Sequence, residues 1–465
     1  MTSDSSQRVV VIGGGLAGMA AAVALETAGI NVTLVEARKT LGGRAGSFQD
    51  PQSGEILDNC QHVLLGCCTN LLDFYKRIGA IHRITFERTI RFVDPKGRAF
   101  GLYGLPFLPA PLHLGWSMLF FSALSLKERI AMTRAMLAML RLGRSRRTAM
   151  DDLPFGKWLA DHNQPESLIA KLYDAILIGS LNEDPRLSSS SYAIQVFQDA
   201  LLTNAAGYPL GLANCPLTEL YGSLPCRDVR LGTRVSQLSF IENQLRGVQL
   251  TSGDSLDADD IVLATNHHGI RDWFPENLAA SDSRFAHLEE LQSVPILGAH
   301  LWFDRPVMRH SHAAFLQGPL QWLFRKDAEG KAVHGVISAA RSWLDVPRED
   351  ALKQFEAQIR ATFPAAASAK LNRGVIVIEK RATFACLPGT DHHRPPQAPP
   401  TGGIANLYLA GDYTQTGWPA TMEGAVRSGY LAAEAILQKR GKLRANFLQP
   451  DLPEQWPARL LNAKH

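Results

Sequence analysis

Three glycines near the start of the chain have the spacing of a dinucleotide-binding turn. Gly13, Gly15 and Gly18 form a GxGxxG pattern between a β-branched run at 9–12 and a segment rich in alanine and leucine at 16–28. This order predicts a strand, a tight turn and a helix. The glycines permit the sharp turn, the approach of the backbone to a pyrophosphate, and close packing of the helix on the strand.

A carboxylate follows at the distance expected for a ribose ligand. Leu16 and Ala17 open the predicted helix, whose free N–H groups would face the phosphates. Glu36 ends the second predicted strand, at 31–35, about 20 residues after the glycines. A carboxylate there accepts hydrogen bonds from an unphosphorylated ribose, which favours FAD or NAD over NADP.

A second glycine pair narrows the choice of cofactor. Gly42, Gly43 and Arg44 follow Glu36 and Arg38. Two more backbone N–H groups near a diphosphate, and a guanidinium to neutralise it, favour FAD. The alternative is a structural βαβ unit without a ligand, which the strand–turn–helix context disfavours.

Composition excludes several classes of protein. The 465 residues suit two intertwined domains, and 46% hydrophobic with 20% charged residues is typical of a globular protein. A net charge of +4 gives no case for nucleic acid. Six cysteines without paired CxxC spacing predict neither a disulfide scaffold nor a metal site. The apolar start of the chain is similar in composition to a signal peptide, but its glycine spacing predicts a nucleotide-binding turn instead. We therefore expect a cytoplasmic protein.

A polar cluster follows the glycine-rich turns. Asp58, Cys60 and His62 lie close together in the sequence GEILDNCQH. A histidine beside an apolar pocket is a candidate proton donor. The alternative, in which Asp58 and His62 only satisfy backbone groups in a turn, stays open.

The segment 104–147 combines an uncharged stretch with a basic one. Residues 104–126 carry no charge, but three prolines in their first half exclude a transmembrane helix. Residues 127–147 contain seven basic side chains against one acidic side chain, Glu128, with apolar residues interleaved. This pairing predicts peripheral contact with anionic lipid; the alternative is a helix packed on the substrate domain with a solvated basic face.

The rest of the chain alternates between helices and strands. Helices are expected at 155–161, 166–181, 190–204, 349–363 and 421–436, and strands at 234–241, 245–251, 260–265, 296–303, 334–341, 375–384 and 407–410.

Taken together, these motifs resemble the flavin amine oxidase and phytoene desaturase superfamily. The resemblance rests on the GxGxxG turn, on Leu-Gly-Gly-Arg at 41–44, and on AGDYTQTGWPATMEG at 410–424. It implies an α/β fold with FAD as cofactor: a discontinuous Rossmann-like FAD-binding domain and an inserted α+β substrate domain. The expected FAD-binding parts are 1–90, 205–290 and 370–440, the substrate domain comprises 91–204 and 291–369, and 441–465 is a C-terminal tail.

The resemblance also assigns further cofactor contacts. Backbone at Val235 would meet the adenine, and Gly411 with Asp412 would bind the phosphate–ribityl region. Further residues are expected near the flavin ring: Trp418, Lys380, Thr421 and Met422.

At finer grain the chain resembles the squalene-associated branch of this superfamily, the hydroxysqualene dehydroxylases. The similar stretches are DNCQHVLLG at 58–66, residues 70–79, EKRATF at 379–384 and residues 410–429. This resemblance implies reductive removal of the hydroxyl group of hydroxysqualene, a polyisoprenoid, to give squalene for hopanoid synthesis. His62 would donate the proton, Asp58 would orient it, and Cys60 would lie nearby.

Three alternatives remain at this point. A carotenoid-type desaturase or an amine oxidase-like enzyme would take hydride from its substrate, and an isoprenoid-binding protein would have no catalysis. The sequence has no second dinucleotide motif, so the electron donor is either transiently bound NAD(P)H or a separate reductase.

Overall fold

A five-stranded parallel sheet carries the glycine-rich turn. The computed structural model describes residues 8–241 and 244–462. The sheet has the order β10-β2-β1-β14-β20. Its strands are β10 (Asp228–Arg230), β2 (Asn31–Val35), β1 (Arg8–Ile12), β14 (Asp260–Leu263) and β20 (Leu407–Leu409). The expected strand–turn–helix unit is confirmed, with α1 (Leu16–Thr27) following β1.

Both faces of this sheet are buried at its centre, which is why β1 and β14 contain uninterrupted apolar runs at 9–12 and 261–263. Val9 and Val11 face α1 and α13 (Met422–Lys439), and these two helices pack against each other. Val10 and Ile12 lie in a separate apolar cluster on the other face. Because successive side chains of a strand point to opposite faces, residues 9–12 contribute alternately to these two cores.

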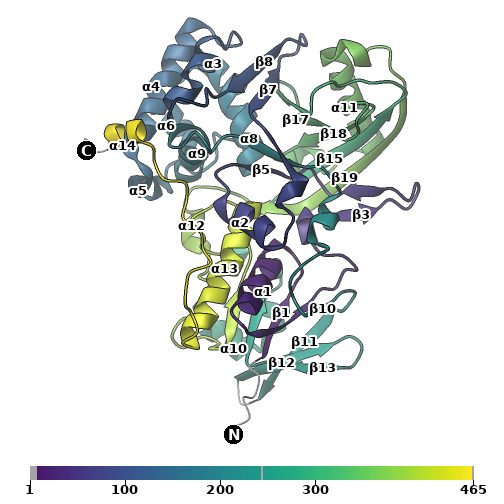
Figure 1. Ribbon diagram of the computed structural model, residues 1–465, viewed down its shortest axis with the longest axis vertical. Coiled ribbons are helices and arrows are strands. Elements are labelled where there is room, and N and C mark those ends of the chain that lie inside the picture. Colours follow the sequence, from purple (N-terminus) through teal and green to yellow (C-terminus); the bar gives the residue numbers. More distant parts are fainter. Residues whose placement is uncertain (1–7, 242–243, 463–465) are drawn as a thin grey trace.

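A second, seven-stranded sheet forms the substrate domain with one long helix. Its order is β19-β15-β18-β17-β16-β7-β8, and α11 (Arg348–Thr362) packs on it (Figure 1). The strands are β7 (Thr89–Val93), β8 (Ala99–Tyr103), β15 (Ser293–Phe303), β16 (His312–Phe315), β17 (Trp322–Arg325), β18 (Ala332–Ile337) and β19 (Leu371–Phe384). The short strands β16 and β17 were not expected from the sequence.

The expected domain boundary at residue 370 is wrong. Strand β19 pairs antiparallel with β15 along almost its whole length, so 371–384 belong to the substrate sheet. The chain returns to the parallel sheet only at β20. Alternating apolar residues fit either sheet, which is why the sequence pattern did not separate the two.

A helical lobe covers the other side of the substrate domain, at the upper left of Figure 1. The helices expected at 155–161, 166–181 and 190–204 are confirmed, with two π-helical turns inside them. The lobe comprises α3 (Gly115–Leu119), α4 (Leu126–Leu142), α5 (Arg144–Arg147), α6 (Phe155–Asp161), α7 (Glu166–Leu168), η5 (Ile169–Tyr173), α8 (Asp174–Leu181), α9 (Ser190–Phe197) and η6 (Gln198–Leu202).

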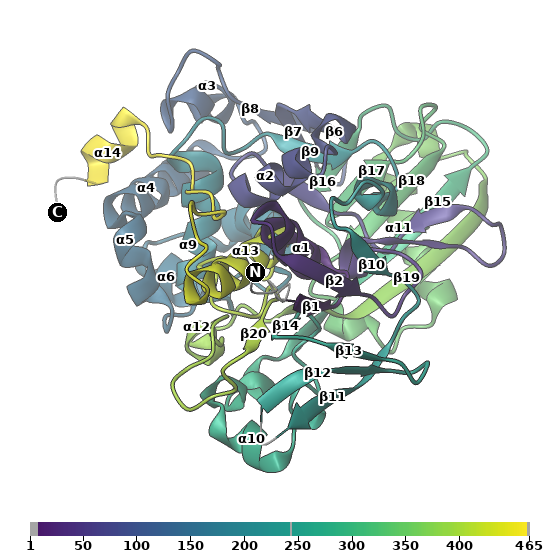
Figure 2. The ribbon, with the colours of Figure 1, turned by 60° about the horizontal axis from the view of Figure 1, so that its bottom comes forward.

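Three small sheets complete the fold. They are the hairpin of β3 (Ser47–Gln49) and β4 (Ile56–Asp58), the sheet of β5 (Val63–Leu65), β9 (Leu210–Ala213) and β6 (Ile84–Glu87), and the sheet of β11 (Val235–Ile241), β12 (Gln244–Leu250) and β13 (Ser255–Asp257). Figures 1 and 2 both place β11–β13 on the opposite side of the molecule from α3. Beside them lies α10 (Glu276–Ser281).

The basic segment is not a uniformly basic surface helix. A capping box of Ser125 and Glu128 starts α4, which ends before Gly143. Arg144 and Arg147 turn inward and form ion pairs with buried Asp199. Within 8–241 and 244–462, no helix is both long and apolar enough to cross a membrane.

The C-terminal segment is a strap that crosses the molecule. After α13 it reaches the helical lobe, where α14 (Trp456–Asn462) packs against α4 (Figure 1). On the way, the backbone N–H of Gln449 donates to Asn70 Oδ1 at 2.7 Å, and Gln455 Oε1 accepts from the backbone N–H of Ala110. The strap thus ties both domains together.

Candidate active site

One cavity of about 710 Å³ runs from the glycine-rich turn into the substrate domain. Its wall is built from segments that are far apart in the sequence. They include the GxGxxG turn, the second glycine turn at 42–43, residues 59–63 and the start of α13. Most of the cofactor residues expected from the sequence lie on this wall: Gly13, Gly15, Leu16, Ala17, Glu36, Arg38, Gly42, Gly43, Arg44, Val235, Gly411, Asp412, Trp418, Thr421 and Met422.

The nucleotide end of the cavity has the geometry that the motif predicts. Gly13 has a φ of +113°, and its N–H donates to the carbonyl of Val35 at 2.8 Å, which closes the turn between β1 and β2. Glu36 accepts from the backbone N–H of Gly14 at 2.6 Å and from that of Arg38 at 2.8 Å. The carboxylate is therefore fixed at the end of β2, on the cavity wall.

Gly18 has a structural role, since it does not line the cavity. A Cβ at this position would lie 1.9 Å from the carbonyl oxygen of Gly13. A Cβ on Gly15, by contrast, would meet no atom within 4 Å. Gly15 therefore leaves open space where a diphosphate can approach the backbone, and Gly18 keeps α1 close to β1.

An ion pair joins the N-terminal and C-terminal halves of the site. Arg44 lies 2.6 Å from the carboxylate of Asp412 and also donates to the carbonyl of Ala382. Arg38 reaches the carbonyl of Gly43 at 3.0 Å. The ion pair holds the second glycine turn against the loop after β20.

The start of α13 points its free N–H groups toward the cavity. Thr421 caps the helix by accepting from the N–H of Gly424 at 3.1 Å, and Met422 is its first residue. The indole of Trp418 donates to Asp451 at 3.2 Å. The positive end of the helix dipole can stabilise negative charge at this point.

The expectation for Lys380 is wrong. Its side chain is exposed on β19 and does not line the cavity, whereas the neighbouring residues Glu379 and Arg381 do. Residue 380 lies where the pairing of β19 with β15 is irregular, and its side chain faces solvent.

The substrate end of the cavity is mostly apolar. It is enclosed by the seven-stranded sheet on one side and by the helical lobe on the other. Its apolar lining includes Ile90, Phe92, Leu102, Ile176, Val196, Leu201, Leu210, Ile296, Trp322, Phe324 and Val336. Such a lining suits a long hydrocarbon, which needs few polar contacts.

His62 lies on the cavity wall, in a turn where Asn59 donates to the carbonyl of Arg44 and Cys60 packs against Phe324 and Val336 of the apolar end. Its Nδ1 is 3.0 Å from the carbonyl oxygen of Cys60. A carbonyl only accepts, so Nδ1 carries the proton and Nε2 is the nitrogen left for a substrate. Burial lowers the pKa of His62 below its usual value. Burial also raises the pKa of the Cys60 thiol to about 12, so this thiol is protonated at neutral pH.

Asp58 does not orient His62 as expected. Its carboxylate accepts from Lys326 Nζ at 2.8 Å, from Ser47 Oγ at 2.9 Å and from the N–H of Leu217 at 3.0 Å. Burial raises the pKa of this carboxyl, but these partners together hold it below its usual value. The imidazole of His62 is oriented instead by the carbonyl of Cys60.

Three polar groups at the site were not found from the sequence. Lys326 follows β17 and also donates to Gln61 on the cavity wall. Asp199 lines the cavity from a π-helical turn, and Glu379 accepts from Asn59 at 3.2 Å. Lys326 and Asp199 belong to no local motif, and Glu379 begins the stretch 379–384, for which only the resemblance as a whole was noted. The π-helical turn that carries Asp199 is a feature often found at functional sites, but the sequence does not reveal where a π-helix forms.

The family model for flavin containing amine oxidoreductases matches residues 16–437. The chain belongs to this family. The match covers the substrate domain and all of the parallel sheet except its strand β1.

Relatives and solved structures agree with this membership. The chain is 27% identical to a 15-cis-phytoene desaturase of Synechococcus elongatus over 94% of its length and 97% of that protein. It is 28% identical to a zeta-carotene desaturase of Synechocystis, over 95% and 99% respectively. Among solved structures, cyclohexylamine oxidase from Brevibacterium oxydans has a TM-score of 0.66 at 19% identity, covering 94% of this chain and 100% of that one. A putrescine oxidase variant has a TM-score of 0.68 at 16% identity, covering 93% and 99%.

The cofactor of this family member is FAD, and the residues present fit it. The open space at Gly15, the N–H groups that begin α1 and the carboxylate of Glu36 form one continuous cradle. The expected α/β fold with a Rossmann-like domain is confirmed.

Substitution of Arg44 by alanine is expected to weaken FAD binding. The change removes a charge-assisted hydrogen bond and leaves Asp412 without its cation. Such bonds contribute about 1.5–3 kcal/mol, which corresponds to roughly 10- to 100-fold in Kd. Fluorescence titration of the apoprotein with FAD measures this. Arg38→Ala, which removes only a bond to a backbone carbonyl, should have the smaller effect; equal Kd values for Arg44→Ala and the unaltered protein would contradict the assignment.

Proposed function

We propose that this FAD-dependent oxidoreductase removes the hydroxyl group of hydroxysqualene and releases squalene. The observation that supports this reaction best is His62, a titratable group on the wall between the nucleotide end and the apolar end of one cavity. Removal of a hydroxyl group needs a proton donor at that place. The stretches at 58–66 and 379–384 that resemble hydroxysqualene dehydroxylases both contribute to this wall.

The proposed step converts an allylic alcohol into a hydrocarbon. Protonated His62 gives its proton to the hydroxyl oxygen, the C–O bond breaks, and water leaves. Reduced FAD, when bound, supplies the hydride that forms the new C–H bond. The hydride takes the place of the hydroxyl group on carbon, and the proton leaves with that hydroxyl as water, so the substrate gains two electrons and the cofactor loses two. The apolar lining keeps other water away from the intermediate cation.

The proposed cofactor contacts follow the cavity wall. The N–H groups at Gly15, Leu16 and Ala17 would bind the diphosphate, and Glu36 the ribose. Val235 would meet the adenine. The ion pair of Arg44 and Asp412 would hold the middle of the cofactor, with Gly42, Gly43 and Gly411 close by. Trp418, Thr421 and Met422 would border the ring, where the N-terminus of α13 would stabilise negative charge on the reduced flavin.

The relatives favour a second candidate, desaturation of a carotenoid precursor. Both named relatives are desaturases, and they match over almost the whole chain. In that reaction the substrate would lose hydride to oxidised FAD, and the same apolar cavity would serve. The two reactions run in opposite redox directions.

Product analysis separates the two candidates. Purified protein, reduced under anaerobic conditions, is mixed with hydroxysqualene, and oxidised protein is mixed with phytoene. Mass spectrometry is expected to find squalene in the first mixture and unchanged phytoene in the second. New double bonds in phytoene together with unchanged hydroxysqualene would establish the desaturase instead. A protein that takes up no FAD would point to an isoprenoid-binding role.

We further propose that the enzyme is cytoplasmic and takes its substrate from the membrane surface. Large apolar side chains of the uncharged segment are exposed, among them Phe107 at 76%, Trp116 at 52% and Phe120 at 61%. The rings of Trp116 and Phe120 lie 4.8 Å apart. The exposed basic residues Lys127 and Arg134 lie on the adjoining helix α4. The electron donor would be NAD(P)H or a separate reductase.

The double variant Trp116→Ser/Phe120→Ser is expected to lose most of its binding to vesicles. Burying one such side chain contributes about 1.5–3 kcal/mol, so the loss should be roughly tenfold or more. Sedimentation with vesicles of phosphatidylcholine and phosphatidylglycerol measures it. Leu344→Ser, which alters an exposed apolar residue elsewhere, is the control. Unaltered protein that stays in the supernatant at low salt would rule out the contact.

A further inference from the structure

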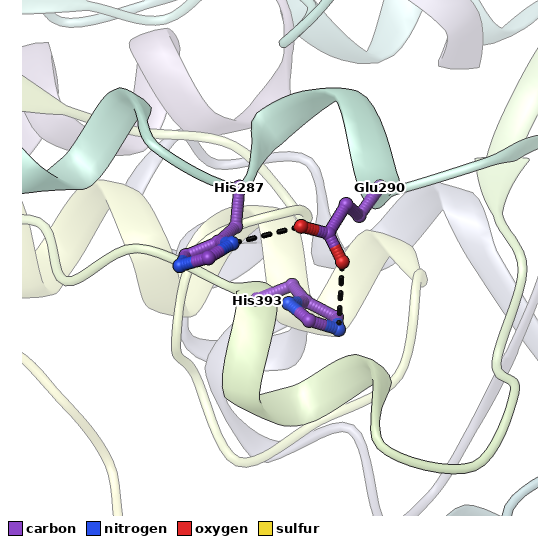
Figure 3. A group of neighbouring side chains, drawn as sticks. All are labelled: His287, Glu290 and His393. Carbon is purple, nitrogen blue, oxygen red and sulfur yellow. Dashed lines mark hydrogen bonds and ion pairs between the residues drawn. The ribbon is translucent and has the colours of Figure 1, made fainter.

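Two imidazoles and a carboxylate converge at a place outside the cavity. His287 precedes η10 (Leu288–Glu290), and His393 ends α12 (Thr390–His393). His287 Nδ1 lies 2.8 Å from Glu290 Oε1, and His393 Nε2 lies 3.2 Å from Glu290 Oε2 (Figure 3). The side chains come from two elements and point toward one another.

We propose that His287, Glu290 and His393 form a binding site for a divalent transition metal of the zinc type. Two imidazole nitrogens and a carboxylate oxygen are a typical zinc ligand set, with water in the fourth position. The three ligand atoms all lie within 4.8 Å of one another. Ligands at about 2.0–2.1 Å from a tetrahedral zinc ion stand roughly 3.3 Å apart, so the widest spacing, at most 4.8 Å, must close by about 1.5 Å or less.

The charge of the cluster suits a cation. Glu290 contributes one carboxylate between the two imidazoles, and each of its oxygens lies within 3.2 Å of a ring nitrogen. A metal ion would take the place of the protons that now join the imidazoles to this carboxylate. About half of the Glu290 side chain is exposed, which leaves a path for the ion and for its water ligand.

The neighbouring cluster of Asp151, Asp152 and His392 is a poorer site. Asp151 already accepts from Ser189 Oγ and from the N–H of Asp391. His392 and Asp152 are 3.9 Å apart and strongly exposed. His392 therefore offers a matched control, since it is an adjacent imidazole on the same helix.

The position of the site indicates a structural role. Arg394, directly after His393, is fully buried and donates to the carbonyl of Asp412 at 3.1 Å and to Thr416 Oγ1 at 2.9 Å. A metal ion would fasten η10 to α12 and so fix the residue that supports the Asp412 loop. We therefore expect the ion to raise the Tm of the FAD-loaded protein without entering the reaction.

Titration calorimetry of the chelator-treated, FAD-loaded protein with Zn²⁺ tests the site. One equivalent is expected to bind and to raise the Tm. This equivalent and the Tm increase should be lost in His287→Ala and His393→Ala and kept in His392→Ala. Glu290→Gln, which preserves size and polarity, should also lose them, so a folding defect of the alanine variants cannot imitate the result.

Any one of three results would overturn the proposal. The first is that the unaltered protein binds no Zn²⁺. The second is equal binding in all variants, as for adventitious surface histidines, and the third is loss of the bound Zn²⁺ in His392→Ala alone. Because calorimetry and Tm do not depend on turnover, the outcome is independent of the substrate.

Discussion

Gly18→Ala is expected to yield a destabilised protein that is purified without FAD. The added Cβ would lie 1.9 Å from the carbonyl oxygen of Gly13 and 3.1 Å from Cβ of Ala264. The first of these atoms belongs to the backbone of the tight turn, so relief requires α1 to move away from β1. Overpacking of this kind costs about 3 kcal/mol or more. Urea denaturation measures the loss of stability. The ratio of the flavin absorbance to the protein absorbance measures the loss of FAD.

Two other glycines serve as matched controls for this variant. Gly15→Ala adds a Cβ that meets no atom within 4 Å, at a φ of −76°. It should fold normally but bind FAD roughly tenfold or more weakly, because the methyl group points into the space needed by the diphosphate. Gly115→Ala, also without contacts, should change neither property beyond about 0.5 kcal/mol. Full FAD content and unchanged stability in Gly18→Ala would contradict the claim that α1 must pack closely on β1 at Gly18.

His62→Ala is expected to keep FAD and to lose most of its dehydroxylation rate. General acid catalysis contributes about 10²–10⁴-fold, and among the described residues that line the cavity His62 is the one histidine. Single-turnover rates with reduced protein and hydroxysqualene measure the loss. His82→Ala, an exposed histidine on another element, is the control. An unchanged rate in His62→Ala would remove this residue from the mechanism.

The pH profile gives a second readout for the same residue. Since burial lowers the pKa of His62, the ring is mostly neutral at pH 7, and its protonated fraction increases as pH falls. The rate of the unaltered protein should therefore rise as pH falls from 7, and it should level off only below the usual histidine pKa of about 6.5. His62→Gln, which cannot be charged, should give a flat profile. A profile that keeps its slope in His62→Gln would assign the proton to another group.

Local motifs predicted the nucleotide end of the site well. The turn at Gly13, the carboxylate of Glu36 and the second turn at Gly43 each depend on residues close in sequence, and spacing alone specifies them. The ion pair of Arg44 and Asp412, by contrast, joins residues from opposite ends of the chain. Only the resemblance to a family placed Asp412 at the cofactor.

The substrate end was predicted less well, because its geometry depends on sheet pairing. Lys326 reaches Asp58 only because β17 lies inside the seven-stranded sheet, and β17 has four residues with no clear alternation. The sequence therefore suggested His62 as the partner of Asp58. Likewise, the inward turn of Arg144 and Arg147 depends on a buried carboxylate, Asp199, on another helix.

The most direct test of the proposed reaction follows the flavin and the substrate in one anaerobic experiment. Protein reduced with one equivalent of dithionite is mixed with excess hydroxysqualene, and flavin absorbance and products are recorded together. We expect the flavin to reoxidise as squalene forms, in a ratio of one to one. Reduced flavin that persists beside unchanged hydroxysqualene, in a protein fully loaded with FAD, would contradict reductive dehydroxylation.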